Sequence, residues 1–353
     1  MINIYWVLML LLTFLAYLDQ DKFIKRNYNN RQYTIYTFFL LLIFFVGFRL
    51  DSTDYMSYKG MYQNIYILNN IDFLFAILIK IFKYFNFSFI HFIFFISFIS
   101  ISIKFYYFKK YSPYIYLTLL LYFVFMIHKD LGQIRNALIA AIMLSAIIPL
   151  VSRNIILYFA IIFIACGFHV FALVALPLYF LYPILRNKNY TLLITTFSVT
   201  IFSIGGLFSY IVPFLQDYDF YVTKKLVMYF YHTKYNQEVV INFNVLFLII
   251  SQYILIFLKD SFIKKDSFYE GLYFSFIYSI VIFLCFSDLG IISARVLDFM
   301  AYLPLSILIP YIISQIKDNK IKNIVYAFFI LFAIIRFIPI SQSMEPYKNI
   351  FFS

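Results

Sequence analysis

A cluster of charged and tyrosine side chains follows directly after the apolar run Thr37–Gly47. The cluster contains Arg49, Asp51, Asp54, Tyr55 and Tyr58. A charged side chain near the centre of a bilayer costs roughly 2.5–3.5 kcal/mol on insertion scales, so such charges lie at the edges of spans or in functional cavities. A guanidinium at this place can bind an anion, and a carboxylate can accept a proton. A solvated loop at the end of a helix is the alternative interpretation.

Three further arginines lie near predicted helix ends. Arg135 opens a predicted helix after Asp130-Leu131-Gly132-Gln133-Ile134, and Arg295 opens another within Ile291–Asp298. Helix N-termini carry partial positive charge, so an arginine there is favourable when an anion lies between it and the helix. Arg49 and Arg336 lie at the outer ends of neighbouring predicted spans, on the same side of the membrane as Arg135 and Arg295. Guanidinium groups bind phosphate oxygens well, because they offer paired donors and stay charged.

Each arginine also has a structural interpretation. Arg295 can pair with Asp298 three residues further along the same helix face. Arg135 can pair with Asp130 or extend its side chain to the membrane interface. Arg336 can serve as an interfacial anchor. The sequence alone leaves these alternatives open.

His169 follows Cys166-Gly167-Phe168 in apolar surroundings, where a histidine serves either helix packing or proton transfer. The chain lacks the His/Cys spacing of a metal site, and the D-x-x-D of Asp51–Asp54 is a weak signal. Nucleophilic Ser/His/Asp spacing is also absent. We therefore predict that no metal and no cofactor takes part.

The composition indicates an all-α polytopic membrane protein. The sequence is 64% hydrophobic and 12% charged, and its mean hydropathy is +0.88. Apolar runs long enough to cross about 30 Å of hydrocarbon recur along the whole chain. Two cysteines, Cys166 and Cys285, indicate no disulfide framework. The net charge of +12 does not predict nucleic-acid binding, because most lysines fall in short loops and set the topology.

About twelve transmembrane helices are predicted. They lie near residues 3–18, 34–48, 88–107, 114–127, 134–151, 155–167, 170–185, 190–214, 244–258, 267–287, 297–316 and 324–338. With the N-terminus outside, the cytoplasmic loops collect many of the basic residues, among them Arg153, Arg186, Lys265 and the group Lys104, Lys109 and Lys110. The spans form one integral membrane domain over residues 1–353.

Two longer outer loops, 49–87 and 215–243, interrupt this pattern. Phe73–Phe85 is apolar but short, so we expect an interfacial or re-entrant amphipathic helix there. Asn154–Arg186 has basic residues at both ends. Two short helices in a hairpin would place His169 at the outer tip, and a single long tilted helix is the alternative.

The chain resembles the EpsG/Wzy family of bacterial polysaccharide (O-antigen or exopolysaccharide) polymerases. The matching motifs, in order, are Arg49-x4-Asp54-Tyr55-x2-Tyr58, Gln133-Ile134-Arg135-Asn136-Ala137-Leu138, Ala165-x3-His169-x2-Ala172-Leu173-Val174-x2-Pro177, and Arg295 at the start of a late span. The chain departs from the family pattern at Leu50-Asp51-Ser52-Thr53, where the family usually has a glycine before the Asp-Tyr pair.

The resemblance implies a membrane glycosyltransferase of GT-C-like architecture in the bacterial inner membrane, with its active site facing the periplasm. Its substrates would be undecaprenyl-diphosphate-linked oligosaccharide repeat units, and its partners the bilayer, a chain-length regulator and a flippase. The growing glycan would move from undecaprenyl diphosphate to the non-reducing end of a new lipid-linked unit. His169 or Asp54 would be the base. The substrate-binding residues would be Arg49, Tyr55, Tyr58, Arg135, Arg295 and Arg336.

Two other functions fit a protein of this kind. A lipid-linked oligosaccharide flippase has a similar number of spans, but more often shows two related halves and shorter outer loops. An O-antigen ligase uses the same lipid donor and the same chemistry as a polymerase. The sugars, the linkage and the oligomeric state cannot be read from the residues.

Overall fold

The computed structural model describes residues 4–20, 28–64, 72–218, 220–231, 238–344 and 346–350 of the chain. Within these ranges the chain forms helices and no strands, and one isolated β-bridge joins Arg49 to Asn349. The helices are α1 (Ile4–Gln20), α3 (Tyr28–Gly47), α4 (Tyr55–Gln63), α5 (Phe73–Tyr84), α6 (Phe89–Tyr111), α7 (Ile115–Gly132), α8 (Ile134–Val151), α9 (Ile155–Phe168), η2 (Val170–Ala175), α10 (Leu176–Leu185), α11 (Lys188–Ser203), α12 (Phe208–Leu215), α13 (Tyr221–Tyr231), α14 (Phe243–Phe262), α15 (Phe268–Cys285), α16 (Gly290–Met300), α17 (Tyr302–Gln315) and α18 (Asn319–Ser343).

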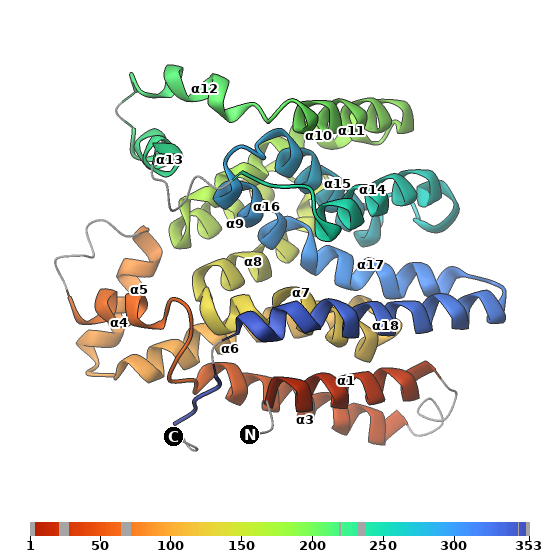
Figure 1. Cartoon of the computed structure of the whole chain (residues 1–353). Helices are drawn as coiled ribbons and strands as arrows, with labels where there is room; N and C mark the ends of the chain where they lie inside the picture. The colour runs from red at the N-terminus through yellow and green to blue at the C-terminus, as the bar shows by residue number, and fades with distance from the viewer. Residues whose placement is uncertain are drawn as a thin grey trace. The chain divides into compact units, whose positions relative to one another are not determined.

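Helix α7 is the centre of the first of two compact units, which takes its residues from 1–144, 167–169 and 306–353. It packs against α1, α6 and α18, and Figure 1 shows α1, α7 and α18 running alongside one another. Phe337 of α18 lies between Trp6 and Phe123, at centroid distances of 5.0 and 5.5 Å. The Tyr326 hydroxyl donates to the Ala16 carbonyl at 2.7 Å. Aromatic packing with few polar links therefore holds these helices together.

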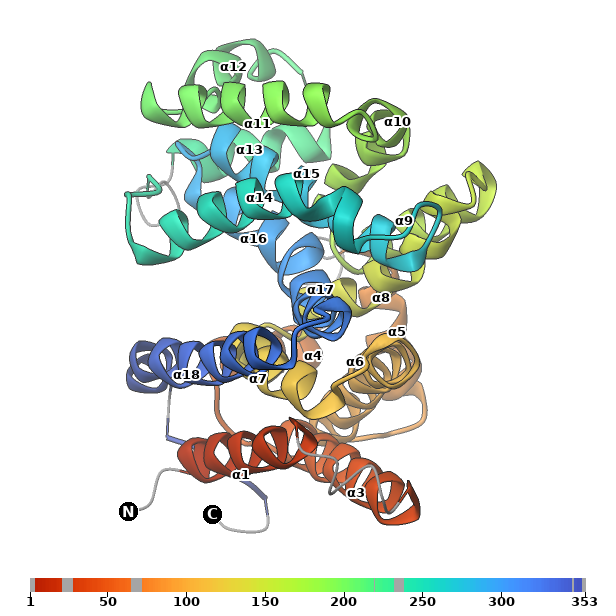
Figure 2. The same ribbon diagram turned by 90° about the vertical axis from the view of Figure 1, so that its right-hand side faces the viewer.

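Helix α15 is the centre of the second unit, which takes its residues from 145–166 and 170–305. It contacts α11, α14 and α16 (Figure 2). Glu270 in its first turn is buried, accepts a hydrogen bond from Tyr182 at 3.1 Å and lies 3.6 Å from both Arg186 and Lys259. A buried carboxylate needs such partners, because an unpaired one would lose its solvation without compensation.

Six helices, α6, α7, α8, α14, α15 and α18, are long and apolar enough to cross a membrane. The count within the described ranges rises to eight if α11–α12 and α16–α17 each form one bent span. Four shorter apolar stretches lie at Ile4–Asp19, Gln32–Gly47, Ile155–Phe168 and Val170–Leu185. Each predicted span coincides with one of these helices or helix pairs.

The predicted span at 190–214 is bent rather than straight. Helices α11 and α12 meet at 82°. Gly205 and Gly206 form the break with φ of +97° and +93°, a region that residues with a Cβ rarely adopt. The Asp288 carboxylate then accepts a hydrogen bond from the Ser209 backbone N–H at 2.6 Å, which satisfies a free donor in the first turn of α12.

The hairpin predicted over Asn154–Arg186 is confirmed, and the single long helix is wrong. Helices α9 and α10 run antiparallel, because the start of α9 contacts η2 and α10. The Tyr158 hydroxyl donates to the Ala175 carbonyl at 2.7 Å, and the Tyr179 hydroxyl donates to the Arg153 carbonyl at 2.6 Å. The apex lies at the break before η2.

The helix predicted at Phe73–Phe85 is α5, which buries Phe75, Ala76 and Ile79 and exposes Lys80. Its place relative to a bilayer stays a prediction. The second long segment, 215–243, contains α13, and residues 219 and 232–237 of that segment lie outside the described residues.

Candidate functional site

Arg49 is buried at the end of α3. One of its terminal nitrogens donates to the Val46 carbonyl at 2.5 Å, and its Nε has no hydrogen-bond partner among the described residues. The backbone on either side pairs with 348–350, through Leu50 N–H to the Lys348 carbonyl at 2.9 Å. Burial lowers the pKa of Arg49 to about 10, against the opposing effect of nearby Asp130. Arg49 is therefore protonated at neutral pH, and the chain's C-terminal segment covers it.

Asp130 is the buried acceptor of a hydrogen-bond network. It lies 2.6 Å from Lys104 Nζ and accepts from the hydroxyls of Tyr122 at 2.8 Å and Ser100 at 3.0 Å. The prediction that Lys104 belongs to a cytoplasmic loop is therefore wrong, since the lysine is buried within α6 by this carboxylate. Asp130 therefore pairs with Lys104, and Arg135 pairs with another carboxylate.

Arg135 does open α8 as predicted, and its partner is Asp72. The Nη1 atom lies 2.9 Å from Asp72 Oδ2, and the two side chains are 17% and 2% exposed. The guanidinium also lies over the rings of Tyr58 and Phe75, at 5.6 and 5.3 Å from their centroids. The chain itself thus supplies, through Asp72, the anion expected beside Arg135 at this helix end.

Helix α4 presents its tyrosines to the protein interior. Tyr55 and Tyr58 are buried on one face, and Tyr55 packs edge-on against Phe89 at 5.2 Å. Asp54 is the residue that precedes the helix, and its side chain makes no capping bond to the first turn. Tyr58 holds the Arg135 guanidinium in place, and both tyrosines lie in the electrostatic field of Arg49.

His169 is buried at the apex of the hairpin, directly after α9. A Cβ at Gly167 would lie 2.4 Å from Cγ of Leu74 in α5. Only glycine permits this close approach of the apex to α5.

Arg336 lies on α18 with its guanidinium over the ring of Phe125, 5.0 Å from the centroid. It is close enough to His128 of α7 for their charges to interact. The first unit therefore brings Arg49, Tyr55, Tyr58 and Arg135 together around two buried carboxylates, and it also contains Arg336.

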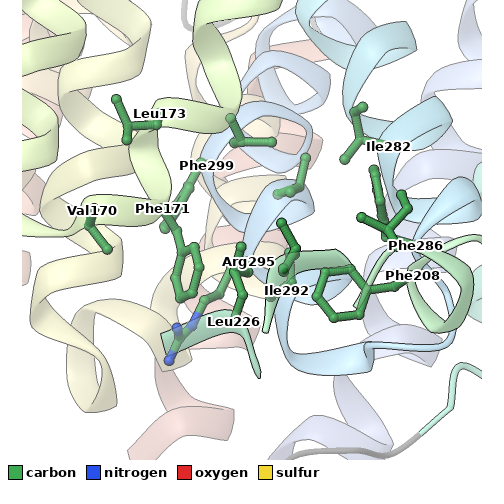
Figure 3. A pocket seen from close by; sticks show the side chains of 14 residues that line it. Val170, Phe171, Leu173, Phe208, Leu226, Ile282, Phe286, Ile292, Arg295 and Phe299 are labelled. Carbon is green, nitrogen blue, oxygen red and sulfur yellow. The ribbon is translucent and has the colours of Figure 1, made fainter. Parts of the chain in front are cut away.

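Arg295 belongs to the second unit and lines a pocket of about 370 Å³. It lies in the second turn of α16, which begins at Gly290 rather than at Arg295 as predicted. Its guanidinium lies 5.3 Å from the ring centroids of both Phe171 and Tyr229, and Figure 3 shows it beside Phe171. It forms no ion pair with Asp298, and its Nη1 is buried without a hydrogen-bond partner in the described part of the chain.

The other residues that line this pocket are apolar. They are Val170, Phe171, Leu173, Val174, Phe208, Ile211, Leu215, Leu226, Ile282, Phe286, Ile292, Val296 and Phe299. The pocket thus offers hydrocarbon walls and one fixed cation. Across the described ranges, no three His, Cys, Asp or Glu side chains are arranged to hold a metal ion.

The model of the EpsG family matches residues 32–349. This chain belongs to the EpsG family. That family is the one of Wzy-type polysaccharide polymerases, so the chain is a multi-pass membrane protein of polysaccharide synthesis. Searches of the curated proteins and of the solved structures find no match.

Within this EpsG chain, sequence reasoning missed three polar residues. Asp72 precedes an apolar helix and resembles an ordinary loop residue, Lys104 resembles a helix-end lysine, and His128 has no motif around it. Lys104 alone had a usable signal, which it shares with Asp130. Lys104 and Asp130 are charges inside runs otherwise apolar enough to span, and such charges usually have a partner or a function.

Proposed function

We propose that this protein polymerises lipid-linked oligosaccharide repeat units. In this proposal the growing glycan moves from undecaprenyl diphosphate to the non-reducing end of a new undecaprenyl-diphosphate-linked unit. Membership of the EpsG family supports polymerisation of a polysaccharide. The assignment of a lipid-linked donor rests on one observation, which is that Arg295 lies in the wall of an apolar pocket.

The pocket suits an isoprenoid diphosphate for two reasons. Its hydrocarbon lining is as apolar as the bilayer interior, so an isoprenoid chain can enter it from the membrane without a solvation penalty. The buried Nη1 of Arg295 lacks a partner in the described chain, and buried polar groups in proteins are nearly always hydrogen-bonded. A phosphate oxygen would provide that bond.

The reaction forms a bond from an acceptor hydroxyl oxygen to the anomeric carbon and breaks the bond from that carbon to the diphosphate. The bonding electrons leave with the diphosphate, and a fixed guanidinium stabilises this developing charge. We assign that contact to Arg295, and Arg49, Arg135 and Arg336 of the first unit remain our further candidates for substrate binding. The hydroxyl proton goes to a base, for which His169 and Asp54 remain our candidates.

We further propose that the six long helices, the two bent pairs and the four shorter apolar stretches each cross the bilayer. They would make a twelve-span, GT-C-like protein, a single integral domain over residues 1–353. Its active site would face the periplasm from the inner membrane, with 49–87 and 215–243 as outer loops that carry interfacial helices. A flippase that supplies repeat units and a chain-length regulator would be its partners.

The test uses the purified protein in detergent with a synthetic lipid-linked repeat unit, and counts the repeats in each product by gel and mass spectrometry. Wild-type protein is expected to give a ladder. Arg295→Lys keeps the charge but loses the paired donors, so turnover should fall about tenfold, and Arg295→Gln should give no ladder. Arg153→Lys is the matched control, because Arg153 also lies over a ring, that of Tyr179, outside the pocket.

Two results would contradict this function. An Arg295→Gln variant that polymerises like wild type would remove the role of the pocket. A wild-type protein that makes no ladder would favour the alternatives. A flippase yields no new bond, and a ligase joins the glycan only when a different acceptor is added.

A further inference from the structure

A second pocket, of about 280 Å³, lies in the first unit, and the function proposed above assigns it no role. The end of α7, the segment after α3 and the end of α18 form its walls. It is lined by Tyr5, Asp51, Ser52, Thr53, His128, Leu131, Gly132, Gln133, Ser343 and Met344. A Cβ at Gly132 would lie 2.8 Å from Thr53 Oγ1, so a glycine is needed where the segment lies against α7.

Two of these residues carry a buried polar atom without a partner. His128 Nδ1 and Ser52 Oγ are buried, and neither has a hydrogen-bond partner among the described residues. Leaving one such atom unsatisfied costs about 1–3 kcal/mol. Two in one small pocket are unusual in a folded protein and indicate that a polar ligand completes the site.

The lining favours a neutral ligand rich in hydroxyl groups. No lysine or arginine lines the pocket, and the Lys129 ammonium beside it already donates to the Gln133 amide oxygen at 3.2 Å. Its one acidic residue, Asp51, is already paired with Lys348 at 2.9 Å. The Gln133 amide oxygen also accepts from Asn136 at 2.8 Å, so the NH₂ group of Gln133 is left for a ligand.

A hydroxyl group matches these atoms, because it can donate to one neighbour and accept from another. A neutral imidazole likewise has one donor and one acceptor nitrogen, and serine has both functions in one atom. The volume lies just below the range of about 300–1,000 Å³ for drug-sized ligands, so the pocket fits a small group such as one sugar ring.

We propose that this pocket binds the terminal sugar of the acceptor repeat unit, with His128 and Ser52 hydrogen-bonded to its hydroxyl groups. This inference rests on the proposed polymerase function, for which it supplies the acceptor side. The lipid-diphosphate pocket around Arg295 holds the donor, and the His128 pocket selects the sugar that is extended.

The probe is the free repeat-unit oligosaccharide, released by mild acid from the lipid-linked units of the source strain. Its binding to purified wild-type protein is measured by calorimetry, beside His128→Leu, Ser52→Ala and Gln133→Leu. Each variant should weaken binding about 3- to 10-fold, the loss of one hydrogen bond. His91→Leu is the matched control, because His91 is exposed and lies outside the pocket. Thermal unfolding verifies that each variant is folded.

The outcomes separate this proposal from the proposed function. If wild-type protein makes the ladder but does not bind the free oligosaccharide, or if the three pocket variants bind it as wild type does, the acceptor pocket is wrong and the polymerase stands. If the oligosaccharide binds through His128 and Ser52 but no ladder forms, the pocket is a sugar site and the polymerase function fails.

Discussion

At the scale of single residues, the Arg135–Asp72 ion pair fixes the position of the Arg135 guanidinium in the first unit. Asp72 is almost fully buried, whereas Arg135 reaches partly to solvent. Removing one partner of a buried pair leaves the other as an uncompensated charge, which destabilises more than removing both. The pair therefore holds the start of α5 against the start of α8.

We expect Arg135→Gln to lower the free energy of unfolding by about 2 kcal/mol, because it removes the ion pair of the buried Asp72 carboxylate. Adding Asp72→Asn should restore at least half of that loss. Thermal and denaturant unfolding of the three proteins in detergent measure the coupling. The control is Lys348→Gln, whose ion pair with Asp51 is largely exposed and should matter little. Additive losses in the double variant would contradict the pair.

The sequence singled out four candidate arginines, but it did not predict what each one contacts. Arg135 was correctly placed at a helix start, and its need for an anion follows from the helix dipole. The identity of that anion could not be predicted, because Asp72 is 63 residues away and is brought near only by tertiary packing. His128 was not predicted as a candidate site residue for a related reason. A lone histidine in an apolar run has no spacing to distinguish it, and only the pocket reveals its neighbours.

At the scale of secondary-structure elements, the α11–α12 bend depends on two consecutive glycines that have unequal surroundings. A Cβ at Gly206 would lie 2.6 Å from Asp288 Oδ1 and 2.9 Å from its backbone nitrogen, whereas one at Gly205 would meet nothing within 4 Å. Both have φ in the region that favours glycine. A glycine is therefore needed at 205 only for its positive φ. At 206 it is needed both for its positive φ and because a Cβ would clash with Asp288.

We expect Gly205→Ala to lower the unfolding free energy by about 1–2 kcal/mol through backbone strain. Gly206→Ala should cost clearly more, because the neighbouring backbone nitrogen cannot move aside as a flexible side chain can. Gly60→Ala in α4 is the opposite control. It has open space and lies in a helix interior, so it should stabilise by about 0.5–1 kcal/mol. Unfolding temperatures in detergent rank the three. Equal losses at 205 and 206 would mean that Asp288 does not confine the turn.

Such bends are hard to predict from hydropathy. The run over 190–214 has the length and composition of one span, and apolar composition does not report direction. The glycine pair was a usable signal, because two adjacent glycines in an apolar run favour a break. The α9–α10 hairpin was predictable, since basic residues at both ends of one apolar stretch require the chain to turn back.

At the scale of the whole molecule, the segments that form helices were predictable and their division into units was not. Apolar length alone finds spans, because each must match the thickness of the hydrocarbon. The two compact units arise from contacts between distant parts of the chain, such as Tyr326 with Ala16, which periodicity does not encode. Orientation in the membrane depends on charge asymmetry between loops, and this property can be measured directly.

The last prediction concerns that orientation. We expect Met56→Cys to react with a membrane-impermeant thiol reagent in intact spheroplasts, in a background with Cys166→Ser and Cys285→Ser, because we propose that α4 belongs to an outer loop over 49–87. Asn189→Cys and Lys265→Cys should react only after permeabilisation, because their loops carry the basic residues that stay in the cytoplasm. All three positions are exposed side chains, so labelling in permeabilised membranes verifies that each cysteine is reachable. Labelling of Asn189→Cys from outside, with Met56→Cys protected, would invert the proposed orientation and place the segment 49–87 in the cytoplasm, which contradicts a periplasmic polymerase.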